Sequence, residues 1–148
     1  MQYEIKQSGK FKFVQEGTGE SLVLLHGLFG ALSNFKDLVD CFKENYTVYI
    51  PMLPLYDLTN FDTSVSGLAK HVAKFIDAKK LNNVHLLGNS LGGHIALVYA
   101  LAHPEKVKTI TLTGSECLEE GKNYMAYVIG YQSGTYGGYE PFKGVEVG

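Results

Sequence analysis

The 148-residue chain carries 13 basic and 15 acidic side chains, and its 45% hydrophobic content is typical of one globular domain. The net charge of −2 gives no electrostatic basis for binding nucleic acid. Every basic residue is lysine, so the chain lacks the guanidinium groups that bind phosphate or carboxylate in a bidentate manner.

The first part of the chain alternates polar and apolar residues. This pattern over residues 2–7 and 10–16 predicts an antiparallel hairpin with a turn near Ser8–Gly9. Residues 21–25, Ser-Leu-Val-Leu-Leu, predict a strand that is buried on both faces. A loop bracketed by glycines follows over residues 26–30. The N-terminus has no apolar signal-peptide core, and no apolar run is long enough to cross a bilayer, so we expect a cytoplasmic protein.

Strands and helices alternate from residue 21 to residue 113, which favours a parallel sheet with helices on both faces. The remaining strands are predicted over residues 47–50, 84–88 and 107–112, and the helices over residues 35–42, 65–76 and 91–102. With the N-terminal hairpin, this predicts an α/β fold whose sheet is mostly parallel. Helical position assigns Cys41 to a buried site as a free thiol, and His71 to the solvent-facing side.

The composition changes after about residue 115. The segment over residues 116–148 is rich in glycine and tyrosine and has no clear period, apart from a short apolar helix or strand near residues 123–131. We therefore expect a core over residues 1–115 and an atypical C-terminal segment of low order.

The most informative motif is Gly-Asn-Ser-Leu-Gly over residues 88–92, because it lies between a predicted strand and a predicted helix. A serine at such a corner is exposed as a nucleophile, and both flanking glycines must be small. Ser90 is expected to take a strained backbone conformation. The backbone N–H groups of Leu91, in the first helical turn, and of Leu28, in the upstream loop, can stabilise an oxyanion. His26 is expected to brace that loop.

Three motifs in this order resemble the N-terminal half of an α/β-hydrolase. They are His26-Gly27-Leu28-Phe29-Gly30, Gly88-Asn89-Ser90-Leu91-Gly92-Gly93-His94 and Ala102-His103-Pro104-Glu105-Lys106-Val107. The resemblance covers residues 1–115, whereas residues 116–148 do not match the usual continuation of the family. It implies a truncated α/β-hydrolase core, with Ser90 as nucleophile, the amides of Leu28 and Leu91 as oxyanion donors, and hydrolysis without a cofactor. A corner serine argues against the dehalogenase and epoxide hydrolase branches, which use aspartate there.

In that family the catalytic residues follow the order serine, acid, histidine. No histidine follows His103 in this sequence, so the usual base is not at its expected place. Glu116 is a candidate for the orienting acid, with a solvated loop glutamate as the plainer interpretation. His94, one turn after Ser90, is a substitute base only if its ring leaves the helix flank. A triad enzyme without its base loses on the order of a million-fold in kcat, so we expect the isolated chain to be nearly inactive.

Two origins for such a chain stay open. It is either a truncated hydrolase or a chain whose segment over residues 116–148 comes from elsewhere or was redesigned. The change in composition slightly favours the second.

The leading functional hypothesis is a serine hydrolase of esterase type that acts on a small acyl substrate, without cofactor or metal. The loops over residues 28–35 and 51–62 would line its pocket, since ligands gather at the carboxyl ends of parallel strands. Phe29, Leu55 and Tyr56 suggest an apolar pocket, and ordinary loop packing is an equal alternative.

The alternative hypothesis is a non-enzymatic binding or assembly module. The strand over residues 107–112 would form an exposed sheet edge, and such edges recruit partners, including copies of the same chain. We expect a homo-oligomer through this edge strand as the partner of this module, and neither nucleic acid nor a membrane. Dinucleotide binding is disfavoured, because the loop after residues 21–25 lacks the glycine pattern that pyrophosphate requires.

Overall fold

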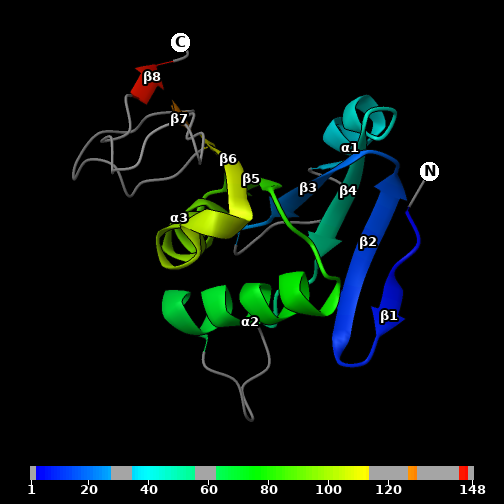
Figure 1. The fold of residues 1–148 in the computed structure, drawn as a ribbon, viewed down its shortest axis with the longest axis horizontal. Coiled ribbons are helices and arrows are strands. Elements are labelled where there is room, and N and C mark those ends of the chain that lie inside the picture. Colours follow the sequence, from blue (N-terminus) through cyan, green and yellow to red (C-terminus); the bar gives the residue numbers. More distant parts are fainter. Residues whose placement is uncertain (1–2, 28–34, 56–62, 114–126, 130–143, 147–148) are drawn as a thin grey trace.

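The computed structural model describes residues 3–27, 35–55, 63–113, 127–129 and 144–146 (Figure 1). A six-stranded sheet organises most of them, in the order β1-β2-β4-β3-β5-β6. Its strands are β1 (Lys6–Ser8), β2 (Phe11–Gly17), β3 (Glu20–Leu25), β4 (Tyr46–Pro51), β5 (Val84–Asn89) and β6 (Val107–Thr113). The strands β4, β3, β5 and β6 are parallel, and the N-terminal strands pair antiparallel. This confirms the predicted fold class.

The N-terminal hairpin is shorter than its sequence pattern predicted. Ser8 pairs with Phe11 across a turn in which Gly9 has φ 57°, a left-handed conformation that glycine adopts at little cost. β1 begins at Lys6 rather than at residue 2, and all its residues are exposed. An edge strand that buries no side chain gains little from extending the pairing.

Helices cover both faces of the sheet (Figure 1). The α-helices are α1 (Lys36–Phe42), α2 (Val65–Ala78) and α3 (Leu91–Ala102), and a short 3₁₀ helix, η2 (Pro104–Lys106), precedes β6. The larger core lies between the sheet and the pair α2 and α3, and the smaller core lies beneath α1. This two-sided burial explains why the apolar run of β3 has no polar alternation.

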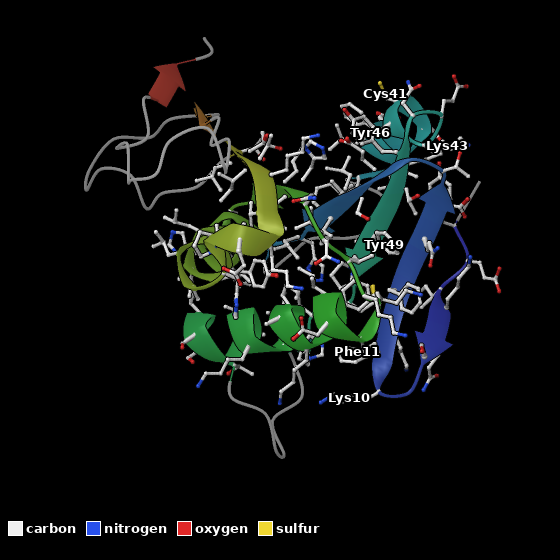
Figure 2. The ribbon with its side chains drawn as sticks, in the orientation of Figure 1. Lys10, Phe11, Cys41, Lys43, Tyr46 and Tyr49 are labelled. Carbon is white, nitrogen blue, oxygen red and sulfur yellow. The ribbon has the colours of Figure 1, made fainter. Side chains whose placement is uncertain are left out.

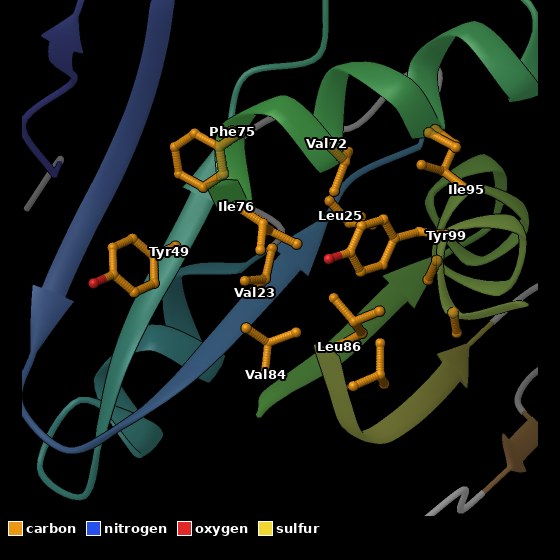
Figure 3. Packing of buried hydrophobic residues seen from close by; sticks show 14 of the residues in the cluster. Val23, Leu25, Tyr49, Val72, Phe75, Ile76, Val84, Leu86, Ile95 and Tyr99 are labelled. Carbon is orange, nitrogen blue, oxygen red and sulfur yellow. The ribbon is translucent and has the colours of Figure 1, made fainter. Parts of the chain in front are cut away.

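The larger core is built around aromatic and branched aliphatic side chains (Figure 3). Phe75 of α2 is fully buried, and its ring centroid lies 5.8 Å from that of Phe11 and 5.4 Å from that of Phe13. Tyr99 of α3 is also buried, and desolvation raises the pKa of its hydroxyl. α3 is apolar on nearly all sides, yet Leu101 on its outer side remains exposed.

Two side chains lie where the helical pattern did not place them. His71 is buried rather than solvent-facing, because it follows Leu68 by three residues and so lies on the apolar stripe of α2. Its ring centroid lies 5.3 Å from that of Phe11, and desolvation is the main cause of its lowered pKa. Cys41 is exposed rather than buried (Figure 2). It follows the buried Val39 by two residues, which is about 200° around the helix.

Two further strands, β7 (Tyr127–Ile129) and β8 (Gly144–Glu146), pair antiparallel in a separate two-stranded sheet. The division of the chain at residue 115 into a core and a C-terminal segment stays a prediction. Across the described ranges, no helix combines the length and the apolar character that a membrane span needs.

Candidate active site

Ser90 stands at a sharp corner between β5 and α3. β5 ends at Asn89 and α3 begins at Leu91, so a single residue makes the turn. Ser90 has φ 54° and ψ −119°, and such a conformation costs a non-glycine residue about 1–3 kcal/mol. The residue is exposed, so solvent and ligands can reach this corner.

The glycines on either side of the corner allow three backbone segments to pass close together. A Cβ on Gly88 would lie 2.3 Å from the carbonyl oxygen of Gly92. A Cβ on Gly92 would lie 2.0 Å from the carbonyl oxygen of Leu25, the last residue of β3. Neither position can carry a side chain unless the backbone moves. The small residues of the motif are therefore required by the crossing of β3, β5 and α3.

The backbone that follows β3 lies beside the Ser90 side chain. A Cβ on Gly27 would lie 3.2 Å from the Cβ of Ser90 and 3.7 Å from its Oγ. Leu91 is the first residue of α3, where a backbone N–H has no acceptor within the helix and the helix dipole favours negative charge. Leu28, the other expected oxyanion donor, falls outside the described ranges, as does Phe29.

His26 joins the loop after β3 to the segment after β4. It is 5% exposed, and its Nε2 accepts a hydrogen bond from the backbone N–H of Leu53 at 3.1 Å. This contact assigns the ring proton to Nδ1, which lies 3.0 Å from the carbonyl oxygen of Gly27. Both ring nitrogens are used, in agreement with the expected bracing role.

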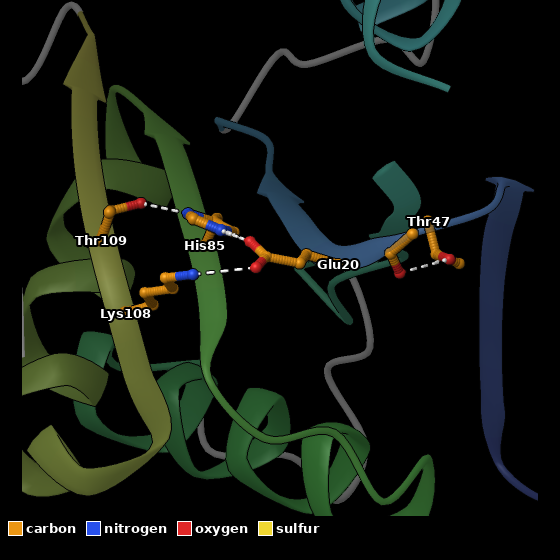
Figure 4. Close-up of polar contacts among 6 residues, drawn as sticks. Glu20, Thr47, His85, Lys108 and Thr109 are labelled. Atoms are coloured by element: carbon orange, nitrogen blue, oxygen red, sulfur yellow. Dashed lines mark hydrogen bonds and ion pairs between the residues drawn. The ribbon is translucent and has the colours of Figure 1, made fainter. Parts of the chain in front are cut away.

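His85 belongs to a polar cluster at the amino-terminal ends of the parallel strands, away from Ser90 (Figure 4). Its Nδ1 lies 2.7 Å from Oγ1 of Thr109, and its Nε2 lies 2.6 Å from Oε2 of Glu20. Lys108 donates to the other oxygen of Glu20 at 2.8 Å. The hydrogen bonds of Glu20 with Lys108 and with His85 lower the pKa of its carboxyl group to about 2, and the bond with Lys108 is the larger cause.

A polar surface hollow of about 440 Å³ lies at the same amino-terminal ends, lined by Gly19, Glu20, Ser21, Asn82, Asn83 and Lys108. Its position separates it from the corner, because Ser90 follows the carboxyl end of β5. Ligands of parallel α/β sheets bind at the carboxyl ends, so this hollow is not the expected substrate site.

The two remaining histidines lie at opposite ends of α3. His103 is the C-cap of α3, at the end opposite Ser90, and its ring centroid lies 4.9 Å from that of Tyr99. His94 is half-buried in the first turn, where its backbone N–H lies 3.4 Å from the carbonyl oxygen of Ser90. His94 and His26 are therefore the histidines nearest in the fold to the corner, and His26 has both ring nitrogens in use.

The other predicted site residues are only partly placed. Glu116 and Tyr56 belong to segments beyond the described ranges. Leu55 is half-buried and packs against the larger core, which is the loop-packing alternative considered for it. Within the described part of the chain, no group of three or more histidine, cysteine or acidic side chains could hold a metal ion.

One contact at the corner was not indicated by any motif. Oγ1 of Thr113 donates a hydrogen bond to Oδ1 of Asn89 at 3.1 Å, directly before Ser90. The two residues meet because they are partners in the register of β5 and β6. A sequence pattern does not reveal such a register.

Comparisons with known proteins place this geometry in a family. The chain matches the alpha/beta hydrolase fold over residues 20–145, so the match continues past residue 115, where the predicted core ends. Among solved structures it is similar to MGS-MChE2, an alpha/beta hydrolase enzyme from the metagenome of lagoon sediments of Mar Chica, Morocco. The identity is 48% and the TM-score 0.74, over 79% of this chain and 54% of that chain.

Two curated relatives are similar over the same region. A 2-hydroxy-6-oxononadienedioate/2-hydroxy-6-oxononatrienedioate hydrolase from Burkholderia vietnamiensis is 40% identical, over 66% of this chain and 37% of the relative. Lipase 3 from Moraxella sp. is 34% identical, over 64% of this chain and 31% of the relative. The chain thus spans about a third of the length of these relatives. Together with the strand order and the serine corner, the match over most of its length shows that the chain belongs to the alpha/beta hydrolase fold family.

Proposed function

We propose that this chain is the nucleophile-bearing part of a serine hydrolase of esterase or lipase type. One observation carries the proposal: Ser90 is exposed in a strained conformation at a strand-to-helix corner, with the backbone of Gly27 beside its Oγ. Strain of this kind persists where function requires it. Similarity to a lipase supports acyl transfer as the type of reaction.

In the proposed reaction, Ser90 Oγ attacks the carbonyl carbon of a small acyl ester. The hydroxyl proton passes to a base, and the carbonyl oxygen becomes an oxyanion that the amides of Leu91 and Leu28 stabilise. Collapse of this intermediate breaks the ester C–O bond, forms acyl-Ser90 and releases the alcohol, which takes up the proton held by the base. Water then attacks the acyl carbon, a proton returns to Ser90 Oγ through the base, and the carboxylic acid leaves. Each oxyanion donor contributes about 3–4 kcal/mol to the transition state in enzymes of this type.

Three of the histidines are not placed to act as the base of this mechanism. His26 and His85 have both ring nitrogens in contact with other groups, and His103 caps the far end of α3. We therefore propose that the chain by itself acylates slowly, at roughly 10³–10⁴ times the rate in water. Glu116 remains the proposed orienting acid, with Phe29 and Tyr56 as proposed pocket residues.

A fluorophosphonate probe tests this proposal, because it forms a covalent bond with an activated serine hydroxyl. Because the proposed acylation is slow, the probe is used at high concentration over a long incubation, and we expect intact-mass analysis to show one adduct and peptide mapping to place it on Ser90. Ser90→Ala should remove the adduct, and Ser66→Ala is the matched control, because Ser66 is an exposed serine on α2. A folded chain that gives no adduct, or an adduct that persists in Ser90→Ala, contradicts the proposal.

A second candidate function is assembly through β6. Among the described strands, β6 is at one end of the sheet and pairs with β5 alone. Unpaired backbone groups of an edge strand can pair with a second copy of the chain. Sedimentation velocity over a range of concentrations should then show a dimer, and a monomer throughout would contradict this candidate.

A further inference from the structure

The last residue of β6 makes two hydrogen bonds to the corner that carries Ser90. The backbone carbonyl oxygen of Thr113 accepts a bond from the N–H of Ser90 at 2.8 Å. Its side-chain Oγ1 donates to Oδ1 of Asn89 at 3.1 Å. Since Asn89 and Thr113 are register partners, both bonds join the carboxyl ends of β5 and β6.

The conformation of Ser90 requires support from its surroundings. Its φ of 54° lies in the region that favours glycine, so the residue would relax unless its two peptide groups were held. The peptide before Ser90 is held through its N–H by Thr113, and the peptide after it is held through its carbonyl oxygen by the N–H of Gly93 at 2.9 Å. These two bonds fix the torsion angles on either side of the Ser90 Cα. The direction of the Cα–Cβ bond of Ser90, and so the position from which Oγ can act, follows from them.

The side chain of Thr113 decides how firmly its carbonyl oxygen is placed. Thr113 is the last residue of β6, and its pairing with Asn89 is the last described pairing of the two strands. The bond from Oγ1 to Asn89 ties Thr113 to β5 at that point. Both residues are half-buried, whereas Ser90 is exposed, so water competes less with this bond than it would at the corner itself.

We propose that Thr113 is a positioning residue for Ser90, which holds the corner through its carbonyl oxygen and is itself held by its hydroxyl group. The catalytic consequence rests on the proposed function, whereas the conformational consequence does not. Loss of the hydroxyl group should loosen the Ser90 amide and turn Oγ away from the direction of attack.

The conformational part is tested by amide hydrogen exchange of the 148-residue chain, resolved at Ser90 by NMR. Thr113→Val removes the donor at nearly constant volume, and Thr111→Val is the matched control two residues earlier on the same face of β6. We expect exchange at Ser90 to rise on the order of fivefold in Thr113→Val. Thr113→Ser, which keeps the hydroxyl group, should restore the slow exchange, and Thr111→Val should leave it unchanged.

Equal exchange at Ser90 in the two valine variants would overturn the proposal. Should Thr113→Val lose its far-UV circular dichroism, Asn89→Leu removes the same bond from the acceptor side. It should raise exchange at Ser90 in the same way, and unchanged exchange in a folded Asn89→Leu variant would equally overturn the proposal.

The catalytic part is tested by the kinetics of fluorophosphonate labelling. We expect Thr113→Val to lower the maximal labelling rate on the order of fivefold while the probe concentration at half-maximal rate stays unchanged. Thr113→Ser should label as the wild type does. Faster amide exchange with an unchanged labelling rate overturns the catalytic role. A wild-type chain without an adduct refutes the proposed function instead, and the exchange comparison still decides the conformational role.

Discussion

Replacing Gly92 with alanine sets two opposing effects against each other. At an ordinary helix position the change would stabilise the protein by about 1 kcal/mol. Here the new Cβ would lie 2.0 Å from the carbonyl oxygen of Leu25 and 2.9 Å from that of His26. Both obstacles are backbone atoms that cannot rotate away, and overpacking of this severity costs about 3 kcal/mol. We therefore expect Gly92→Ala to lower the free energy of unfolding by about 2 kcal/mol.

Equilibrium urea denaturation followed by circular dichroism measures this change, provided that the slope of the transition stays constant. Gly9→Ala is the control, because nothing lies within 4 Å of its Cβ and only its φ of 57° is unfavourable. It should cost about 1 kcal/mol and leave the labelling of Ser90 unchanged. Gly92→Ala should also slow labelling, since the clash displaces the backbone beside Ser90. A Gly92→Ala variant as stable as the wild type would refute the close crossing of α3 and β3.

Three further outcomes follow from the described contacts. Glu20→Gln should reduce the fall in the free energy of unfolding at acid pH. The ionised carboxylate of Glu20 stabilises the fold above its ordinary pKa of 4.5, and this contribution is lost as pH falls toward about 2. Urea titrations between these pH values measure it, and parallel profiles would contradict the ion pair with Lys108. Phe75→Ala should cost about 3–5 kcal/mol in the same assay, because the ring is fully buried among other aromatic rings, and a loss below about 1 kcal/mol would contradict that packing. His94→Ala should leave the rate of Ser90 labelling within about twofold of the wild type. A fall in this rate by several orders of magnitude, as when a triad enzyme loses its base, would instead identify His94 as the base.

Much of the fold follows from local pattern, because the parallel strands β3, β4 and β5 are short and apolar and each precedes a helix. α3 begins and ends where the sequence predicted it, at Leu91 and Ala102, since a tight corner precedes it and a proline follows it. The errors concern which side of a helix faces the core. Cys41 was predicted inside and His71 outside, and the packing is the reverse, since a buried ring fits beside Phe11 and the one-sided contact of α1 leaves the thiol outside.

The candidate site was likewise predictable in part. The corner at Ser90 was predictable because strand, glycine, serine, glycine and helix follow one another directly in the chain. The contacts of His26 with Leu53 and of Ser90 with Thr113 were not, because each joins segments more than 20 residues apart. Such contacts depend on how strands align, and alignment is a property of the whole sheet.

The register of β5 and β6 shows how far this dependence reaches. Counted from the first pair of the two strands, regular pairing would set Asn89 opposite Leu112, which has no hydroxyl group to donate. Lys108 is the extra residue of a bulge near the start of β6, and it shifts the later pairs so that Asn89 faces Thr113. The same bulge leaves Lys108 free to bind Glu20. One irregular residue at the amino end of β6 therefore decides which side chain reaches the nucleophile corner at its other end, and no hydrophobic pattern specifies where that residue falls.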